Sequence, residues 1–105
     1  MDPSVSAPNG GPLRRKVVIT SPEGLHLRPM RAFVELASKF QCQVRVQRND
    51  LEPVDGKSMF GMMLLGAEQG SELTVEVDGP DGSQALDQLV ELLNTVQHQS
   101  SAEDS

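Results

Sequence analysis

Two stretches with a strict two-residue period constrain the fold of this chain most. In residues 42–47 (CQVRVQ) and again in residues 73–78 (LTVEVD), every second residue is apolar. This period is typical of a β-strand with one buried face and one solvated face. Antiparallel sheets tolerate such a wet face, whereas parallel sheets are covered on both sides. The pattern therefore predicts a sheet with helices on one face only.

Three stretches have the pattern of helices. The first, residues 27–39, carries apolar residues at the i, i+3, i+4 and i+7 positions of one helix face: Met30, Phe33, Val34 and Ala37. The second, residues 59–65, lies between Ser58, a favoured N-cap, and Gly66, a favoured C-cap. The third follows two rival N-caps, Asp81 and Ser83, and its buried face is predicted to comprise Leu86, Leu89, Val90, Leu93 and Val96.

Two further strands complete the expected order of elements. Residues 15–20 (RKVVIT) are β-branched at their centre and predict the first strand. Residues 51–54 predict a short strand at the edge of the sheet, because Pro53 has no N–H to donate to a ladder. The resulting order, β-α-β-β-α-β-α, predicts an α+β fold. We expect an open-faced two-layer sandwich, a four-stranded antiparallel sheet with three helices on one face.

One folded unit with two polar ends is predicted. Residues 1–13 are rich in Pro and Gly and predict a disordered N-terminal arm, and residues 98–105 predict a disordered C-terminal tail. The domain is expected over residues 14–97. No apolar run reaches the length of a membrane span, and no signal-peptide pattern stands at the N-terminus, so we expect a cytoplasmic protein without membrane insertion.

The charges are divided along the chain. The net charge is −6, yet all nine Lys and Arg lie at or before Lys57, and residues 68–105 hold nine acids and no base. The acidic part would repel a phosphate backbone, so nucleic-acid binding is not expected. Cys42 is the single cysteine, so an internal disulfide is impossible, and with two scattered histidines it predicts neither a metal site nor a cofactor.

Residues 24–29 (GLHLRP) predict the chemistry of the chain. His26 stands just before a helix N-terminus, where N–H groups and the helix dipole favour an anion. Arg28 can bind a phosphate in fork geometry. The motif therefore predicts that His26 accepts a phosphoryl group and that Arg28 stabilises it; the alternative is a loop histidine without a role. Arg31 is either a second phosphate contact or a solvated helix residue.

Residues 57–66 (KSMFGMMLLG) contain more apolar side chains than one helix face can bury. Some of them must face solvent, as on the adaptable, methionine-rich binding surfaces of other proteins. Ser58 at the start of this helix is a candidate for regulatory phosphorylation, since a phosphate there would add a charge of about −1.5 to −2 beside the apolar surface. It is equally well explained as a plain capping serine.

With these two motifs in the expected order of elements, the chain closely resembles the HPr family, the histidine phosphocarriers of the bacterial phosphoenolpyruvate-dependent phosphotransferase system. The resemblance covers about residues 15–96 and is carried by residues 24–29 and 55–61 (DGKSMFG). It implies that His26 accepts a phosphoryl group on Nδ1 from enzyme I and passes it to enzyme IIA domains of sugar transporters. It also implies that Ser58 is the site of HPr kinase/phosphorylase. The partner-docking residues that we expect are Leu27, Met30, Lys57, Met59, Phe60 and Met63.

The sequence departs from the usual family pattern beside the histidine. Leu27 and Met30 replace small residues and Arg31 replaces Thr or Ser, which could alter partner choice. A regulatory HPr-like module, nitrogen-related or carbon-regulatory, whose phosphorylation state controls binding to a regulator, kinase or metabolic enzyme, is the alternative function. A stand-alone enzyme is disfavoured, since the sequence pairs no catalytic base with His26 and has no glycine-rich nucleotide loop. We expect a monomeric carrier.

Overall fold

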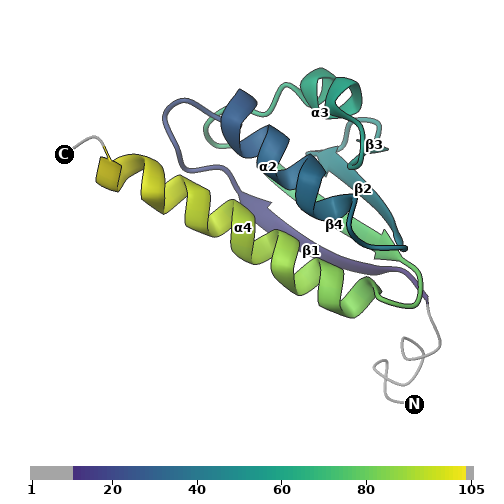
Figure 1. Cartoon of the computed structure of the whole chain (residues 1–105). Coiled ribbons are helices and arrows are strands. Elements are labelled where there is room, and N and C mark those ends of the chain that lie inside the picture. Colours follow the sequence, from purple (N-terminus) through teal and green to yellow (C-terminus); the bar gives the residue numbers. More distant parts are fainter. Residues whose placement is uncertain (1–10, 104–105) are drawn as a thin grey trace, which may run out of the picture.

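The computed structural model describes residues 11–103 and contains the predicted order of elements. Strands β1 (Leu13–Val18), β2 (Gln43–Arg48), β3 (Val54–Asp55) and β4 (Glu72–Asp78) form one sheet in the order β1-β4-β2-β3, and every pairing is antiparallel. Helices α2 (Leu27–Ala37), α3 (Met59–Leu65) and α4 (Gly82–Glu103) lie on one side of the sheet (Figure 1). The predicted α+β open-faced sandwich is confirmed.

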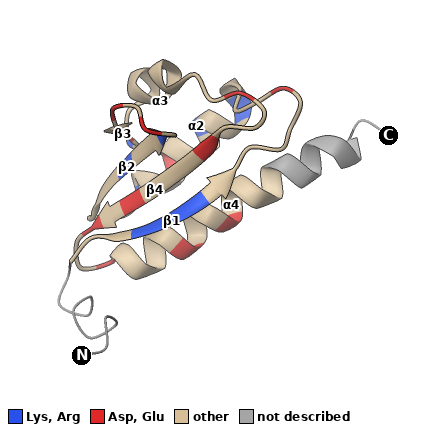
Figure 2. Ribbon diagram, turned by 180° about the vertical axis from the view of Figure 1, so that it is seen from behind, with Lys and Arg blue, Asp and Glu red and all other residues tan. Residues whose placement is uncertain are grey.

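The alternating strands divide the sheet into a buried and a solvated face. β4 pairs with β1 on one side and with β2 on the other, and Val75 lies opposite both Arg15 and Val46. The buried face is formed by Val17, Val44, Val46, Leu73, Val75 and Val77. On the other face, Arg14 of β1 pairs with Glu76 of β4 at 3.2 Å and Lys16 with Glu72 at 3.8 Å, along the two neighbouring strands coloured by charge in Figure 2. The predicted solvent-exposed face of the sheet is therefore present.

The predicted apolar stripes of the helices form the rest of the core. Phe33 and Ala37 of α2 and Leu89 of α4 are fully buried. Val34 and Val96 are only partly buried, at the borders of their stripes. Each fully buried large apolar side chain contributes about 1.5–3 kcal/mol to folding. No helix within residues 11–103 has the length and apolarity required to cross a bilayer.

The ends of two strands differ from the sequence prediction. β1 begins and ends two residues earlier than predicted because its ladder follows β4, from Leu13 opposite Val77 to Val18 opposite Glu72. β3 contains only Val54 and Asp55 instead of residues 51–54. The Leu51 N–H donates to the turn carbonyl of Arg48 at 3.0 Å, and Pro53 has no N–H to donate. The predicted edge position of β3 is confirmed.

The ends of two helices also differ. α2 stops at Ala37 rather than Lys39, because the Lys39 N–H donates to the carbonyl three residues back, on Leu36, at 3.0 Å, as in a tighter 3₁₀ turn. α4 continues to Glu103, since residues 83–105 contain neither Gly nor Pro to end it. The helix thus includes residues 98–103 of the predicted disordered tail. Residues 104–105 of that tail and residues 1–10 of the predicted arm lie outside the described residues.

Asp81 joins the start of α4 to the start of β2. Its carbonyl accepts a hydrogen bond from the Ala85 N–H at 3.0 Å, so Asp81 directly precedes the helix. Its carboxylate does not cap that helix; it accepts the N–H groups of Gln41 at 2.8 Å and Cys42 at 2.9 Å. The hydrogen bond from Gln41, followed by that from Cys42, lowers the pKa of Asp81. Burial raises the pKa of the Cys42 thiol, and Asp81 adds to this effect.

Candidate functional site

The loop that leads into α2 is held against the loop after α3. The Gly24 N–H donates to the Ser21 carbonyl at 2.9 Å, and the Leu25 N–H donates to the Ala67 carbonyl at 3.0 Å. Gly24 has φ +72°, and a Cβ on it would lie 2.6 Å from the Ala67 oxygen. Only glycine fits this position, for both conformational and steric reasons. The first glycine of the 24–29 motif therefore serves to fix the backbone immediately before His26.

His26 is the N-cap residue of α2, and its side chain is partly exposed to solvent. The backbone is extended (φ −94°, ψ −171°), the side chain makes no capping hydrogen bond, and 44% of it is exposed. The carbonyl of His26 accepts the Met30 N–H at 3.1 Å, which closes the first turn of the helix. The ring nitrogen Nε2 lies 3.3 Å from Oε1 of Glu23. Sequence reasoning missed Glu23, because residues 23–26 precede the helix and the helical i, i+3 pairing rule does not apply to them.

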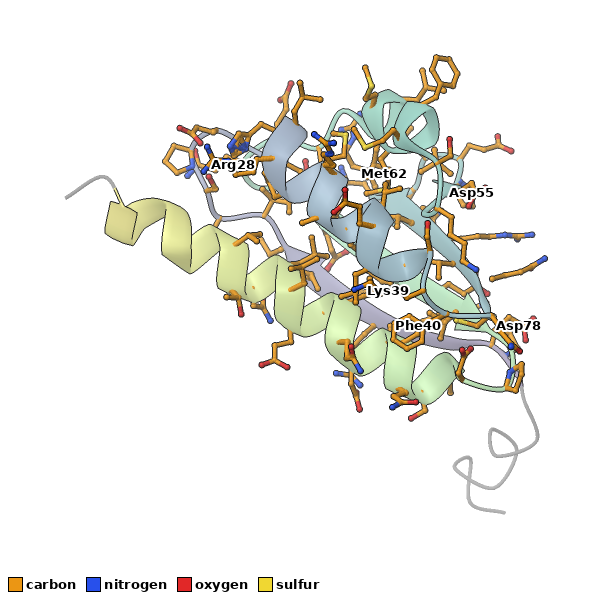
Figure 3. The ribbon with its side chains drawn as sticks, viewed as in Figure 1. Arg28, Lys39, Phe40, Asp55, Met62 and Asp78 are labelled. Carbon is orange, nitrogen blue, oxygen red and sulfur yellow. The ribbon has the colours of Figure 1, made fainter. Side chains whose placement is uncertain are left out.

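The start of α2 favours an anion beside the ring. Leu27, Arg28 and Pro29 occupy the first three helical positions, and Pro29 carries no N–H. The amides of the first turn and the helix dipole present positive partial charge at this end of α2. Arg28 is exposed there, at the N-terminal end of the helix (Figure 3). His26 and Arg28 thus both stand at the N-terminal end of α2, an arrangement that suits an anion such as a phosphoryl group.

Arg31 is a solvated helix residue rather than part of this arrangement. Its Nε lies 3.4 Å from Oε2 of Glu35, one turn further along α2, and both side chains are more than two-thirds exposed, at 74% and 67%. Such exposed i, i+4 pairs are typical of solvated helix faces. Of the two interpretations of Arg31, the structure favours a solvated helix residue over a second phosphate contact.

The hollow beside the ring is too small for a small-molecule substrate. It is lined by residues of the loop and of α2, including His26, and by Val96 of α4, and its volume is about 10 Å³. That is room for about one water molecule, whereas small-molecule sites usually measure a few hundred Å³. The described residues also hold no cluster of three or more His, Cys, Asp and Glu suited to a metal ion. A reacting group would therefore approach the exposed side of the His26 ring from the surface of the protein.

α3 displays an apolar surface beside this site. Ser58 caps the helix, with its Oγ accepting the Gly61 N–H at 3.0 Å, and Gly66 ends it with φ +60°. Both predicted caps are confirmed. A helix of seven residues buries only one face, which here comprises Met62 and Leu65. The exposed large side chains of the helix form what we call the α3 apolar patch: Phe60, Met63 and Leu64, which are 70%, 54% and 65% exposed.

The expected docking residues divide into exposed and structural ones. Leu27 is 61% exposed on α2, which packs beside α3 (Figure 1). Met30 is only 6% exposed, so its assignment to a docking surface is wrong: it belongs to the buried stripe of α2. Met59 is half-buried against the core. The Lys57 ammonium donates to the Phe40 carbonyl at 2.7 Å, which ties it to the chain after α2. Leu64 was missed, although it continues the apolar run 59–65.

Comparisons with known proteins agree with this geometry. A family model described as "PTS HPr component phosphorylation site" matches residues 13–95. The phosphocarrier protein HPr of Pseudomonas aeruginosa is 42% identical over 79 residues, which cover 75% of this chain and 88% of that protein. The chain belongs to the HPr family. As an HPr component it is a phosphocarrier protein of the phosphotransferase system and not a catalyst.

Solved HPr structures have the same fold. The HPr of Bacillus anthracis superposes with a TM-score of 0.72 at 29% identity, covering 78% of this chain and 96% of that one. A structure described as an HPr dimer from Thermoanaerobacter tengcongensis has a TM-score of 0.63 at 38% identity, covering 75% of this chain and 90% of that one. The chain thus spans nearly the full length of these HPr relatives.

Proposed function

We propose that this HPr-family protein carries a phosphoryl group on Nδ1 of His26, accepting it from enzyme I and passing it to enzyme IIA domains of sugar transporters. The observation that carries the proposal is the placement of a half-exposed His26 ring at the start of α2, with Arg28 two residues on. A carrier needs an accessible nucleophile and an anion-stabilising surface. It needs no substrate pocket, which agrees with the small hollow beside the ring.

The transfer requires one bond to form and one to break. The lone pair on Nδ1 of His26 attacks phosphorus, and the bond from phosphorus to the donor protein breaks with its electron pair leaving to the donor. The new phosphoryl oxygens then lie at the positive end of α2, where Arg28 adds a charged, fork-shaped donor. Delivery to the acceptor protein reverses these steps. The ring is regenerated, so the protein turns over as a carrier.

Partners are proposed to dock on Leu27 together with the α3 apolar patch. Each of these side chains is at least half exposed, and they lie on two adjacent helices. Exposed apolar side chains in such a group are typical of protein-binding sites. Arg28 would lie at the rim of this contact, where a positive charge favours partners with acidic surfaces.

Phosphorylation by purified enzyme I and phosphoenolpyruvate tests the proposal. The native chain should acquire an acid-labile, base-stable label, and His26→Ala should lose it. The chain has one other histidine, His98, so His98→Ala is the matched control and should label normally. A label that persists in the His26→Ala variant would refute the carrier site.

Ser58 is proposed as a regulatory phosphorylation site for an HPr kinase/phosphorylase. Its Oγ stands at the first turn of α3 and accepts the Gly61 N–H, so a phosphate there could replace the cap while adding negative charge beside the α3 apolar patch. This supports the second candidate function, a regulatory module whose phosphorylation state controls binding. Incubation with the kinase and ATP, followed by mass spectrometry of native and Ser58→Ala proteins, tests it.

We further propose that the protein works as a cytoplasmic monomer. Because each protein molecule carries one exposed site that docks with successive partners, transfer does not require a second copy of this chain. Light scattering after size-exclusion chromatography tests the oligomeric state, and a stable dimer, as described for the Thermoanaerobacter tengcongensis relative, would overturn this part.

A further inference from the structure

We propose that Glu23 is a positioning residue for His26: it holds the ring proton on Nε2 and thereby makes Nδ1 the nucleophile. The inference rests on the proposed function of His26. It is carried by the 3.3 Å separation between Oε1 of Glu23 and Nε2 of His26. This distance is slightly longer than an average N–H···O bond, but hydrogen bonds in unliganded sites are often long and tighten when the partner binds.

Hydrogen bonds hold the backbone on both sides of Glu23, and this fixed backbone places the carboxylate beside the ring of His26. The Glu23 N–H lies 3.3 Å from Oγ of Ser21, and the Gly24 N–H donates to the Ser21 carbonyl at 2.9 Å. The left-handed Gly24 then turns the chain, and Leu25 is hydrogen-bonded to the Ala67 carbonyl. This turn places residue 23 beside the side chain of residue 26, on the side where Nε2 lies.

The chemistry of the carboxylate selects the tautomer. A neutral imidazole carries its proton on either nitrogen, and the hydrogen bond made by one nitrogen decides the state of the other. An ionised carboxylate accepts hydrogen bonds and donates none. The nitrogen that faces Glu23 must therefore carry the proton, which leaves the lone pair of His26 on Nδ1.

The same proton then remains in place throughout the transfer. When Nδ1 attacks phosphorus, the bond from phosphorus to the phosphorylated donor protein breaks and the ring becomes a cation that keeps its Nε2–H. The Glu23 carboxylate lies against that cation. On delivery, the N–P bond breaks, its electron pair returns to Nδ1, and the ring leaves as neutral imidazole. No proton has to be moved at His26 in either direction.

The contact is not needed for folding. Both side chains are largely solvent-accessible, 44% for His26 and 60% for Glu23, and exposed pairs of this kind contribute little to stability. The Arg31–Glu35 pair on α2 provides a matched control, because Glu35, like Glu23, is largely exposed, at 67%, and lies at a similar separation of 3.4 Å from its partner. Removing Glu35 perturbs a surface charge of the same sign near the site without touching the ring.

Nitrogen-15 NMR of the unphosphorylated protein, recorded where the ring is neutral, tests the tautomer directly. The native chain should show His26 predominantly with the proton on Nε2, whereas Glu23→Gln, whose amide can donate as well as accept a hydrogen bond, should show a weaker preference. Glu23→Ala should show a mixture of tautomers. Phosphoryl transfer from enzyme I should slow by about threefold to tenfold in Glu23→Ala, the effect of one hydrogen bond. Glu35→Ala should match the native chain in both measurements.

An unchanged tautomer ratio in Glu23→Ala would overturn the inference. Because the tautomer is read on the protein without a partner, its result is independent of whether His26 is the carrier. Failure of the carrier site itself would show instead as label remaining on the His26→Ala variant.

Discussion

Replacing Gly24 by alanine should weaken both the fold and the carrier site, and the cost can be estimated from the structure. A left-handed backbone costs a residue with a Cβ about 1–2 kcal/mol. The new methyl group would also lie 2.6 Å from the Ala67 carbonyl oxygen and 3.0 Å from Cα of Glu68. Both contacts are with backbone, so the loop itself must move. That displacement adds about 1–3 kcal/mol, and the hydrogen bond from Leu25 to Ala67 accounts for about 1 kcal/mol more if it breaks.

Gly70→Ala is the matched control. Gly70 also has a positive φ, +90°, but nothing lies within 4 Å of the position of its Cβ, so alanine there adds backbone strain without a clash. We expect Gly24→Ala to lose about 2–4 kcal/mol more than Gly70→Ala, the sum of the displacement and the hydrogen bond. In a domain of this size this difference corresponds to a further fall in Tm of roughly 10–25 °C.

Thermal unfolding followed by circular dichroism measures this difference, and labelling by enzyme I at low temperature measures the functional effect. Since the loop that must move carries His26, phosphoryl transfer should fall in Gly24→Ala even where the protein is fully folded, and should stay near the native rate in Gly70→Ala. Equal losses of Tm in the two variants would refute the steric reasoning. If a folded Gly24→Ala protein accepted the phosphoryl group at the native rate, the argument that the position of this loop controls His26 would be refuted.

Three further predictions concern other parts of the molecule. The lowered pKa of Asp81 means that its stabilising effect is complete above about pH 4, near its ordinary pKa, and is lost as the pH falls through the lowered value. In urea unfolding, Asp81→Ala should therefore have a lower free energy of unfolding than the native chain at neutral pH, and this difference should become smaller in acid. Met62→Ala, at a fully buried site, should cost about 2–5 kcal/mol, whereas Met63→Ala, at a half-exposed site, should leave the unfolding midpoint nearly unchanged and instead weaken binding to enzyme I in calorimetry. Ser58→Asp keeps a side-chain oxygen for the α3 cap, so it should preserve Tm while slowing phosphoryl arrival at His26; unchanged transfer kinetics would remove the regulatory role.

Local sequence patterns predicted most of the fold because they report burial. The two-residue period of residues 42–47 and 73–78 located β2 and β4, and the helical spacing in α2 and α4 located the faces that the sheet covers. The sequence patterns were wrong about where strands begin and end, because the pairing with neighbouring strands sets those ends. β1 ends at Val18, opposite Glu72, the first residue of β4, and β3 is shortened by the turn at Leu51 and by Pro53.

The part of the candidate site that consists of consecutive residues was predicted from the sequence. Residues 24–29 placed a histidine, an arginine and a helix start together, because neighbours in sequence are neighbours in space. The environment of that motif could not be read in this way. Ala67, whose carbonyl accepts the Leu25 N–H and fixes the loop, lies 42 residues after Leu25 in the chain, and no pattern of adjacent residues brings the two together.

The sequence by itself determined which faces of the elements are apolar, where the chain turns, and that an imidazole stands at the beginning of a helix. These properties follow from the side chains and from the backbone preferences of glycine and proline. Only the tertiary structure decided the strand order β1-β4-β2-β3, the use of the Asp81 carboxylate on the chain before β2, and the contact of Glu23 with His26. Each of these depends on the direction in which a hydrogen-bonding group points once the core has closed, and no local pattern of residues records that direction.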